Sequence, residues 1–186
     1  NFVALMHSIN KTFGFNEKTK HLSLLPFGHR ASTNYNNYPA LMAGSGLYIS
    51  EGFEALRTNF FQVIDRYKIT FTEIVPTIAF MLNKLCPDIS NLDLSSLLYI
   101  GCGSSTLPVE TQREFHKKFG IKLANLYGLS ETGPSHFDDP TAVGWEPGTI
   151  GKPIDVNRCR IADDGEILLK GNNVFVGYYK NESLYK

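Results

Sequence analysis

Three short segments of this sequence place small residues, hydroxyls and a few ionisable groups directly after predicted buried strands. The segment 26–29 reads Pro-Phe-Gly-His, so that His29 follows a strand end. The segment 101–106 reads Gly-Cys-Gly-Ser-Ser-Thr, and the segment 127–133 reads Tyr-Gly-Leu-Ser-Glu-Thr-Gly. Open parallel sheets bind their ligands beyond the carboxyl ends of the strands. These three segments are therefore the places where we expect chemistry.

The residue types in these segments suit a nucleotide, its phosphates and a metal ion. Small residues let the backbone approach a flat ring closely, and their N–H and C=O groups can pair with the edge of a base. Tyr127 offers a face for stacking, and the hydroxyls of Ser130 and Thr132 can donate to phosphate oxygens. The single carboxylate of Glu131 suits Mg²⁺, which takes most of its other ligands from water and phosphate.

Each segment alone also has a purely structural explanation. A connection rich in Gly and Ser between a strand and a helix is often only a turn. His29 can be a hydrogen-bonded structural histidine, and a Ser-Glu pair is often a cap or part of a solvated surface. The presence of all three segments in one chain favours the ligand-binding interpretation.

Alternating strand and helix patterns surround these segments and predict an α/β fold. Apolar residues at helical spacing, or a proline at a helix start, predict helices at 2–13, 33–43, 54–67, after Pro76 and after Pro108. Short apolar runs predict strands at 22–25, 47–49, 69–75, 97–100 and 123–127. Strands that are apolar on both faces indicate a parallel sheet flanked by helices on both faces.

The pattern changes after about residue 148. Two short strand patterns, 158–162 and 166–170, flank the turn Asp-Asp-Gly at 163–165. Such turns join antiparallel strands. We therefore expect two parts, an α/β subdomain over 1–148 and a small antiparallel β subdomain over 149–186.

The amino-acid composition limits the binding partners and the cellular compartment that we expect for this protein. Eighteen basic residues balance eighteen acidic ones, so no long-range field attracts nucleic acid or an anionic membrane. Three scattered cysteines without CxxC spacing argue against a disulfide framework or a zinc site and favour a cytoplasmic protein. No apolar run approaches the roughly 18 residues of a membrane span. The chain also lacks an initial Met, and we expect it to be an internal piece of a longer protein.

Five segments, in this order along the chain, resemble the acyl-CoA synthetase, luciferase and peptide-synthetase adenylation superfamily. LLPFGH resembles its Leu-Pro-x-x-His segment, and FTEIVPT resembles its strand ending in Val-Pro-x. GSSTLP resembles its Gly-Gly-Ala-Pro-Leu adenine loop, and YGLSETG resembles its Tyr-Gly-x-Thr/Ser-Glu segment. GTIGKP followed by GEILLKGNNVFVGYY resembles its Gly-Glu-Leu-x-Val-x-Gly and Gly-Tyr stretch. The chain is identified as an internal fragment of the large N-terminal domain of an adenylate-forming enzyme of the acyl-CoA synthetase type.

The resemblance implies a set of site residues. The implied ATP- or AMP-binding residues are Gly103, Ser104, Ser105, Thr106, Asn125, Tyr127, Gly128 and Ser130. Among them the three hydroxyl residues at 104–106 line the adenine, and Tyr127 stacks on it. The implied catalytic residues are Ser130, which contacts phosphate, and Glu131, which holds Mg²⁺. The implied pocket for the carboxylate substrate is bordered by His29, Gly103 and Gly128.

The resemblance also implies a reaction. A carboxylate oxygen attacks the α-phosphorus of ATP, which gives an acyl-adenylate and pyrophosphate, and the acyl group then passes to a thiol such as that of coenzyme A. Mg²⁺ and hydroxyl donors stabilise the negative charge that gathers on phosphorus. The implied cofactors are ATP and Mg²⁺, with coenzyme A as co-substrate and a small carboxylic acid as partner.

Several departures from the family pattern stand out. The family's phosphate loop ending in Pro-Lys-Gly, its Thr-Gly-Asp segment and its mobile C-terminal domain are not in this sequence. Thr106 stands where the adenine loop usually has Pro, and Cys102 stands where a second small residue is usual. We therefore expect the fragment alone to be inactive.

Three other interpretations compete with this one. An adenylation domain that loads a carrier-protein phosphopantetheine is one, although amino acid activation requires an Asp near His29, and PFGHRAS has none. A folded module with little nucleotide affinity is another. A nicotinamide or methyl-donor Rossmann domain would need GxGxxG after the first strand, and Gly101 and Gly103 come too late in the sheet for that.

Overall fold

The computed structural model describes residues 1–181, and the last five residues of the predicted β subdomain lie outside this range. The helices are α1 (Phe2–Phe13), the π-helix η1 (Ser32–Asn37), α2 (Tyr38–Ala43), α3 (Phe53–Leu56), α4 (Phe60–Tyr67), α5 (Pro76–Leu85) and α6 (Val109–Phe119). The strands are β1 (Lys20–Ser23), β2 (Gly46–Ile49), β3 (Phe71–Ile74), β4 (Tyr99–Gly103), β5 (Leu123–Leu129), β6 (Gly133–Phe137), β7 (Lys152–Pro153), β8 (Asn157–Ile161) and β9 (Ile167–Gly171). Each of these helices is too short or too polar to traverse a lipid bilayer.

Seven strands form one sheet in the order β2-β1-β3-β4-β5-β6-β7. The first five of these strands are parallel, as predicted, and β6 and β7 are antiparallel to their neighbours. The sequence does not predict β6, because its residues Gly-Pro-Ser-His-Phe lack the apolar run of a buried strand although all five are buried. The β5–β6 connection is consequently a hairpin, where the sequence suggested an open loop.

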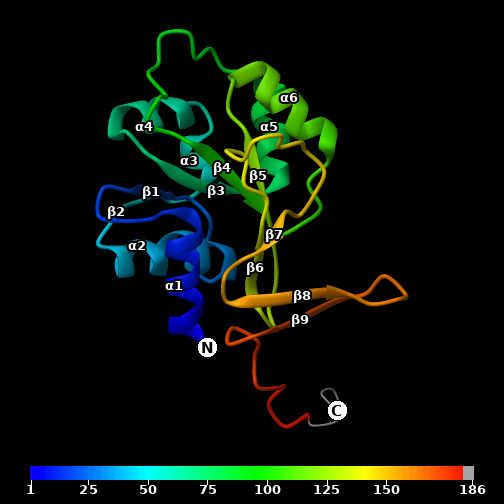
Figure 1. Ribbon diagram of the computed structural model, residues 1–186. Helices are drawn as coiled ribbons and strands as arrows, with labels where there is room; N and C mark the ends of the chain where they lie inside the picture. Colours follow the sequence, from blue (N-terminus) through cyan, green and yellow to red (C-terminus); the bar gives the residue numbers. More distant parts are fainter. Residues whose placement is uncertain (182–186) are drawn as a thin grey trace.

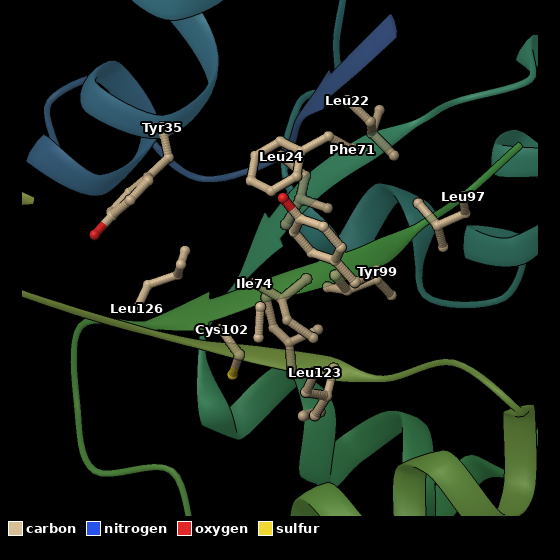
Figure 2. Close-up of a cluster of buried hydrophobic side chains, with 14 of the residues drawn as sticks. Leu22, Leu24, Tyr35, Phe71, Ile74, Leu97, Tyr99, Cys102, Leu123 and Leu126 are labelled. Carbon is tan, nitrogen blue, oxygen red and sulfur yellow. The ribbon is translucent and has the colours of Figure 1, made fainter. Parts of the chain in front are cut away.

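Helices cover both faces of the large sheet (Figure 1). On one face Phe13 of α1 stacks on Phe137 of β6, with ring centroids 4.2 Å apart. On the other face Phe61 of α4 packs against Phe119 of α6 at 4.9 Å. Figure 2 shows the apolar side chains that fill the space around the central strands. Burial of this apolar surface is the main favourable contribution to folding and makes the sheet a firm base for its strand-end residues.

Two predicted helices differ in detail from the structure. The predicted helix 54–67 is interrupted between α3 and α4, where the N–H of Asn59 donates to the Leu56 carbonyl in a turn. Phe60 and Phe61 at the start of α4 are both buried in the core, and each is 1% exposed. The predicted helix 33–43 begins as the π-helix η1 and continues as α2.

The last two strands, β8 and β9, form a separate antiparallel sheet. Their turn is the predicted one: Gly165 has φ +91°, which favours glycine, and the N–H of Glu166 donates to Asp164 Oδ1 at 3.0 Å. The small antiparallel β unit is thus confirmed. The division of the chain at residue 148 stays a prediction, and β7 joins the large sheet through its pairing with β6.

A buried polar layer lies between η1 and the sheet. His21 of β1 and Glu73 of β3 are both fully buried. Burial lowers the pKa of His21 from 6.5 to about 4, and the nearby Asn36 opposes this shift only partly. Burial also raises the pKa of Glu73 well above 4.5. The His21 ring is therefore neutral at neutral pH, and burial favours the uncharged form of Glu73.

The lowered pKa of His21 predicts a loss of stability in mild acid. As the pH falls from 6.5 towards 4, the unfolded chain binds a proton at His21 and the folded chain does not, so the free energy of unfolding decreases by about 3 kcal/mol. Urea unfolding at a series of pH values measures this slope. The variant His21→Gln should lose it, whereas His7→Gln, at an exposed histidine, should keep it. An equal slope in wild type and His21→Gln would contradict the prediction.

Candidate functional site

A cavity of about 190 Å³ lies at the carboxyl ends of β4 and β5. Four of the predicted site residues line it: His29, Ser104, Gly128 and Ser130. They come from three segments that are far apart in the sequence, and the parallel order of the strands brings those segments to one edge of the sheet. The strand-end segments 101–106 and 127–133 therefore line one cavity together with the segment 26–29, which we call the histidine segment.

Gly103 allows β4 and β5 to meet closely beside this cavity. It is paired with Leu126, and a Cβ atom on Gly103 would lie 2.6 Å from the Leu126 carbonyl oxygen. No side chain fits there without separating the strands. Gly103 itself is buried and does not line the cavity, whereas Leu126 does.

The segment after β4 turns sharply at Ser104. Its φ of +72° lies in the left-handed region, which costs energy for a residue with a side chain. This turn places Ser104 at the cavity, and the buried Leu107 anchors the segment to the core. Ser105 and Thr106 are exposed to solvent and do not line the cavity. Such strain in a non-glycine residue is concentrated at functional sites.

The β5–β6 hairpin forms the other side of the cavity. Tyr127 and Gly128 lie within β5, and residues 130–132 form the turn that leads to β6. A Cβ atom on Gly128 would lie 2.4 Å from the Gly133 carbonyl oxygen, so the two strands touch backbone to backbone. The pairing shifts register between Tyr127 and Gly128, which is a β-bulge. Bulges of this kind often redirect side chains near functional sites.

The hairpin turn is held by the segment that follows β9. The N–H of Phe175 donates to the Glu131 carbonyl at 2.7 Å, and Asn173 Nδ2 donates to the Thr132 carbonyl at 2.8 Å. The Tyr178 hydroxyl donates to Glu131 Oε1, and this hydrogen bond is the main reason why the pKa of Glu131 is lowered. Glu131 is ionised at neutral pH and lies next to the cavity without lining it.

His29 and Arg30 lie at the mouth of the cavity. The Ala31 N–H donates to His29 Nδ1 at 3.2 Å, so the proton of the neutral ring resides on Nε2. Arg30 Nη1 donates to the Ser130 carbonyl at 3.2 Å and joins the histidine segment to the hairpin turn. Both side chains are exposed and accessible to an anionic ligand.

Two predicted nucleotide residues lie beside the cavity. The Tyr127 ring meets the His136 ring edge to face, with centroids 5.6 Å apart, and is half-buried. Asn125 Nδ2 donates to the Thr149 carbonyl at 2.7 Å. Neither residue lines the cavity. Their roles in nucleotide binding stay predictions, as do those of the other site residues.

Sequence reasoning missed other residues that line this cavity. These include Arg30, Asn34, Tyr35, Leu126 and Pro134. One signal was present in the sequence: the stretch Ser-Thr-Asn-Tyr-Asn-Asn at 32–37 is unusually polar for a segment that follows a buried strand. Helical spacing alone does not show which of its residues face a ligand.

Comparison with known proteins identifies the family. The family model described as AMP-binding enzyme matches residues 1–179, and the chain belongs to this family. It is 32% identical over 172 residues to the indoleacetate–CoA ligase of Aromatoleum aromaticum, a match that covers 86% of this chain and 33% of that protein. It is 33% identical over 172 residues to the long-chain-fatty-acid–CoA ligase of Bacillus subtilis, covering 86% of this chain and 30% of that protein. The chain thus spans about a third of the length of these curated relatives.

Solved structures confirm the fold. Apo MatB from Rhodopseudomonas palustris superimposes with a TM-score of 0.81 at 20% identity, covering 97% of this chain and 37% of that one. The McyG A-PCP structure complexed with phenylalanyl-adenylate superimposes with a TM-score of 0.82 at 16% identity, covering 98% of this chain and 33% of that one. The family model and the CoA ligase relatives confirm the predicted membership of the adenylate-forming superfamily.

Proposed function

We propose that this chain is the central part of an ATP-dependent acid–thiol ligase, which activates a carboxylic acid as an acyl-adenylate and transfers it to coenzyme A. The observation that carries the proposal is the shared cavity, where Ser104, Gly128, Ser130 and His29 meet at the strand ends. Membership of the AMP-binding enzyme family supports ATP as the nucleotide. CoA ligases among the relatives support coenzyme A as the acceptor.

In this proposal, different residues of the strand-end segments bind different parts of ATP. The exposed residues 104–106 and the half-buried ring of Tyr127 contact adenine, and the Ser130 hydroxyl donates to a phosphate oxygen. His29 and the closely packed backbone at Gly103 and Gly128 border the carboxylate of the acid. A donor that is fixed in place before the reaction stabilises charge on phosphorus without reorganisation during the reaction.

Glu131 fits the role of a Mg²⁺ ligand. Its carboxylate is ionised, partly exposed and next to the hydroxyl-lined end of the cavity. Within residues 1–181 no group of three or more His, Cys, Asp or Glu side chains is placed to hold a metal by itself. A single carboxylate suits Mg²⁺ because phosphate oxygens and water supply its remaining ligands. Bound there, Mg²⁺ would neutralise charge on the phosphates.

Transfer to a carrier-protein thiol is the second candidate. The superposition on the McyG A-PCP structure supports this candidate at the level of the fold. The relatives that are at least 30% identical favour coenzyme A. A transfer assay with the purified adenylate and each thiol distinguishes the two acceptors.

Acid-dependent exchange of pyrophosphate into ATP tests the proposed function. The complete enzyme that contains this chain should catalyse the exchange only when Mg²⁺ and a suitable carboxylic acid are both present. The panel of acids should include short alkyl, hydroxylated, aryl and long-chain members. A folded enzyme that gives no exchange with any acid class would contradict the proposal.

A further inference from the structure

A second cavity lies at the opposite edge of the large sheet from the candidate site. It has a volume of about 290 Å³ and lies at the amino ends of β3 and β4, next to the connection between α1 and β1. The 190 Å³ cavity lies at the carboxyl ends of β4 and β5, so the length of these parallel strands separates the two cavities. The proposed chemistry uses none of the residues that line this second cavity, which we call the amino-end cavity.

Four aromatic side chains form much of the wall of the amino-end cavity. They are Phe13, Phe15, Phe71 and Tyr99, and none of them is more than 9% exposed. Phe15 meets Phe71 with ring centroids 4.8 Å apart, and Phe71 meets Tyr99 edge to face at 6.0 Å. Figure 2 shows the rings of Phe71 and Tyr99 beside each other above the sheet. Aromatic rings favour further rings in offset or edge-to-face contact, so this wall suits a flat aromatic ligand.

Several polar side chains that line the amino-end cavity are already hydrogen-bonded to the main chain. Asn16 Nδ2 donates to a main-chain carbonyl at 3.0 Å, and Ser96 Oγ donates to another at 2.9 Å. Thr70 Oγ1 donates to a third carbonyl at 3.3 Å. Because their protons are used within the protein, these three side chains hold the loops in place and have no proton left for a ligand.

Two other polar groups of the amino-end cavity have no protein partner, and both can donate hydrogen bonds. The Lys18 ammonium group is exposed and makes neither an ion pair nor a hydrogen bond within residues 1–181. The Tyr99 hydroxyl makes no hydrogen bond in the same range, and its oxygen keeps some access to solvent, unlike that of Tyr35. Burial raises the pKa of Tyr99, so its hydroxyl keeps its proton.

The charge at the amino-end cavity favours an anionic ligand. Lys18 is the one charged side chain among the described residues that line it. A carboxylate only accepts hydrogen bonds, and it therefore complements both the ammonium group of Lys18 and the hydroxyl of Tyr99. An amine would instead be repelled by Lys18 and would find no carboxylate on the described part of the wall.

We propose that the amino-end cavity is a second binding site, which takes a small aromatic carboxylic acid. The ring of the acid packs against Phe15, Phe71 and Tyr99, and its carboxylate pairs with Lys18. The site is separate from the cavity that we assign to ATP, and this inference goes beyond the proposed function without depending on it.

Isothermal titration of the complete enzyme with phenylacetate tests this site. A stable analogue of an acyl-adenylate first fills the 190 Å³ cavity, so that the heat reports on the second site. We expect saturable binding of phenylacetate. Phenylacetamide has the same ring without the charge and should bind about fivefold more weakly. Cyclohexylacetate keeps the charge but lacks the aromatic ring and should bind about threefold more weakly.

The variant Lys18→Gln should weaken the binding of phenylacetate by about fivefold and leave the binding of phenylacetamide unchanged. Lys117→Gln is the matched control, because Lys117 is an exposed lysine of α6 that does not line the cavity. It should leave the affinity for both probes unchanged.

No saturable binding of phenylacetate, or equal affinities for phenylacetate and phenylacetamide, would overturn this inference. An unchanged affinity for phenylacetate in Lys18→Gln would overturn it as well. Pyrophosphate exchange tests the proposed function separately, and Lys18→Gln should leave the exchange rate unchanged because Lys18 lies at the opposite edge of the sheet.

Discussion

Replacing Gly128 by alanine will lower the free energy of unfolding by about 3 kcal/mol and abolish saturable ATP binding. The added Cβ atom would lie 2.4 Å from the Gly133 carbonyl oxygen and 2.9 Å from its carbonyl carbon. Both are backbone atoms of the paired strand, so the β5–β6 hairpin must open to relieve the clash. Urea unfolding measures the loss of stability, and calorimetric titration with ATP and Mg²⁺ measures binding.

Gly28→Ala is the matched control for this prediction. Gly28 lies in the histidine segment, and no atom lies within 4 Å of the position of an added Cβ. The same substitution there should change the free energy of unfolding by less than about 0.5 kcal/mol. If Gly128→Ala and Gly28→Ala were equally stable, the close approach of β5 and β6 would not be required for the stability of the fold.

Replacing Glu131 by glutamine will reduce acid-dependent pyrophosphate exchange by the complete enzyme by about 100-fold or more. Glutamine keeps the size of the side chain and can still accept the hydrogen bond from Tyr178, but it lacks the charge that attracts Mg²⁺. Because Glu131 lies in a partly exposed hairpin turn, the fold should be unaffected. The exchange rate at saturating Mg²⁺ is the measurement, with circular dichroism as the check on folding.

The variant Tyr178→Phe distinguishes the effect of the Glu131 charge from the effect of the hydrogen bond that Tyr178 donates to Glu131. The Tyr178 hydroxyl is the largest cause of the lowered pKa of Glu131, so its removal should raise that pKa. The exchange activity of Tyr178→Phe should remain substantial at neutral pH and should fall at a higher pH than in wild type when the solution is acidified. Exchange at the wild-type rate in Glu131→Gln would refute the assignment of Glu131 as the metal ligand.

The sequence predicted those helices and strands whose characteristic residue pattern lies within the element itself. The helix at 2–13 matches α1 because Phe2, Leu5, Ile9 and Phe13 recur at helical spacing and Gly14 ends the helix with φ +70°. The parallel strands were predictable because they are buried on both faces. The β8–β9 hairpin was predictable from its Asp-Asp-Gly turn.

Strand β6 was not predictable, because its burial depends on tertiary contacts. Ser135 and His136 are polar but nearly inaccessible to solvent, and Asn157 Nδ2 donates to the Ser135 carbonyl at 2.9 Å from a distant segment. No periodicity of the sequence encodes such contacts. The hydrogen bond between Tyr178 and Glu131, which joins residues 47 positions apart, escapes sequence reasoning for the same reason.

The candidate site was predicted in part. The motifs at 101–106 and 127–133 pointed to strand-end residues, and the structure brings Ser104, Gly128 and Ser130 together with His29. Asn34 and Tyr35 were missed because helical spacing predicts a helix without showing which residues a π-helical turn directs into a cavity.

The proposed function requires that the strand-end segments at 103–106 and 127–132 bind the nucleotide together. Backbone amide chemical shifts of this chain, recorded during titration with ATP and Mg²⁺, report on each of these residues separately. We expect saturable shifts concentrated in these two segments and at His29, where the 190 Å³ cavity lies. Saturable shifts confined to the separate 590 Å³ cavity around Trp145, with none in the two segments, would contradict it.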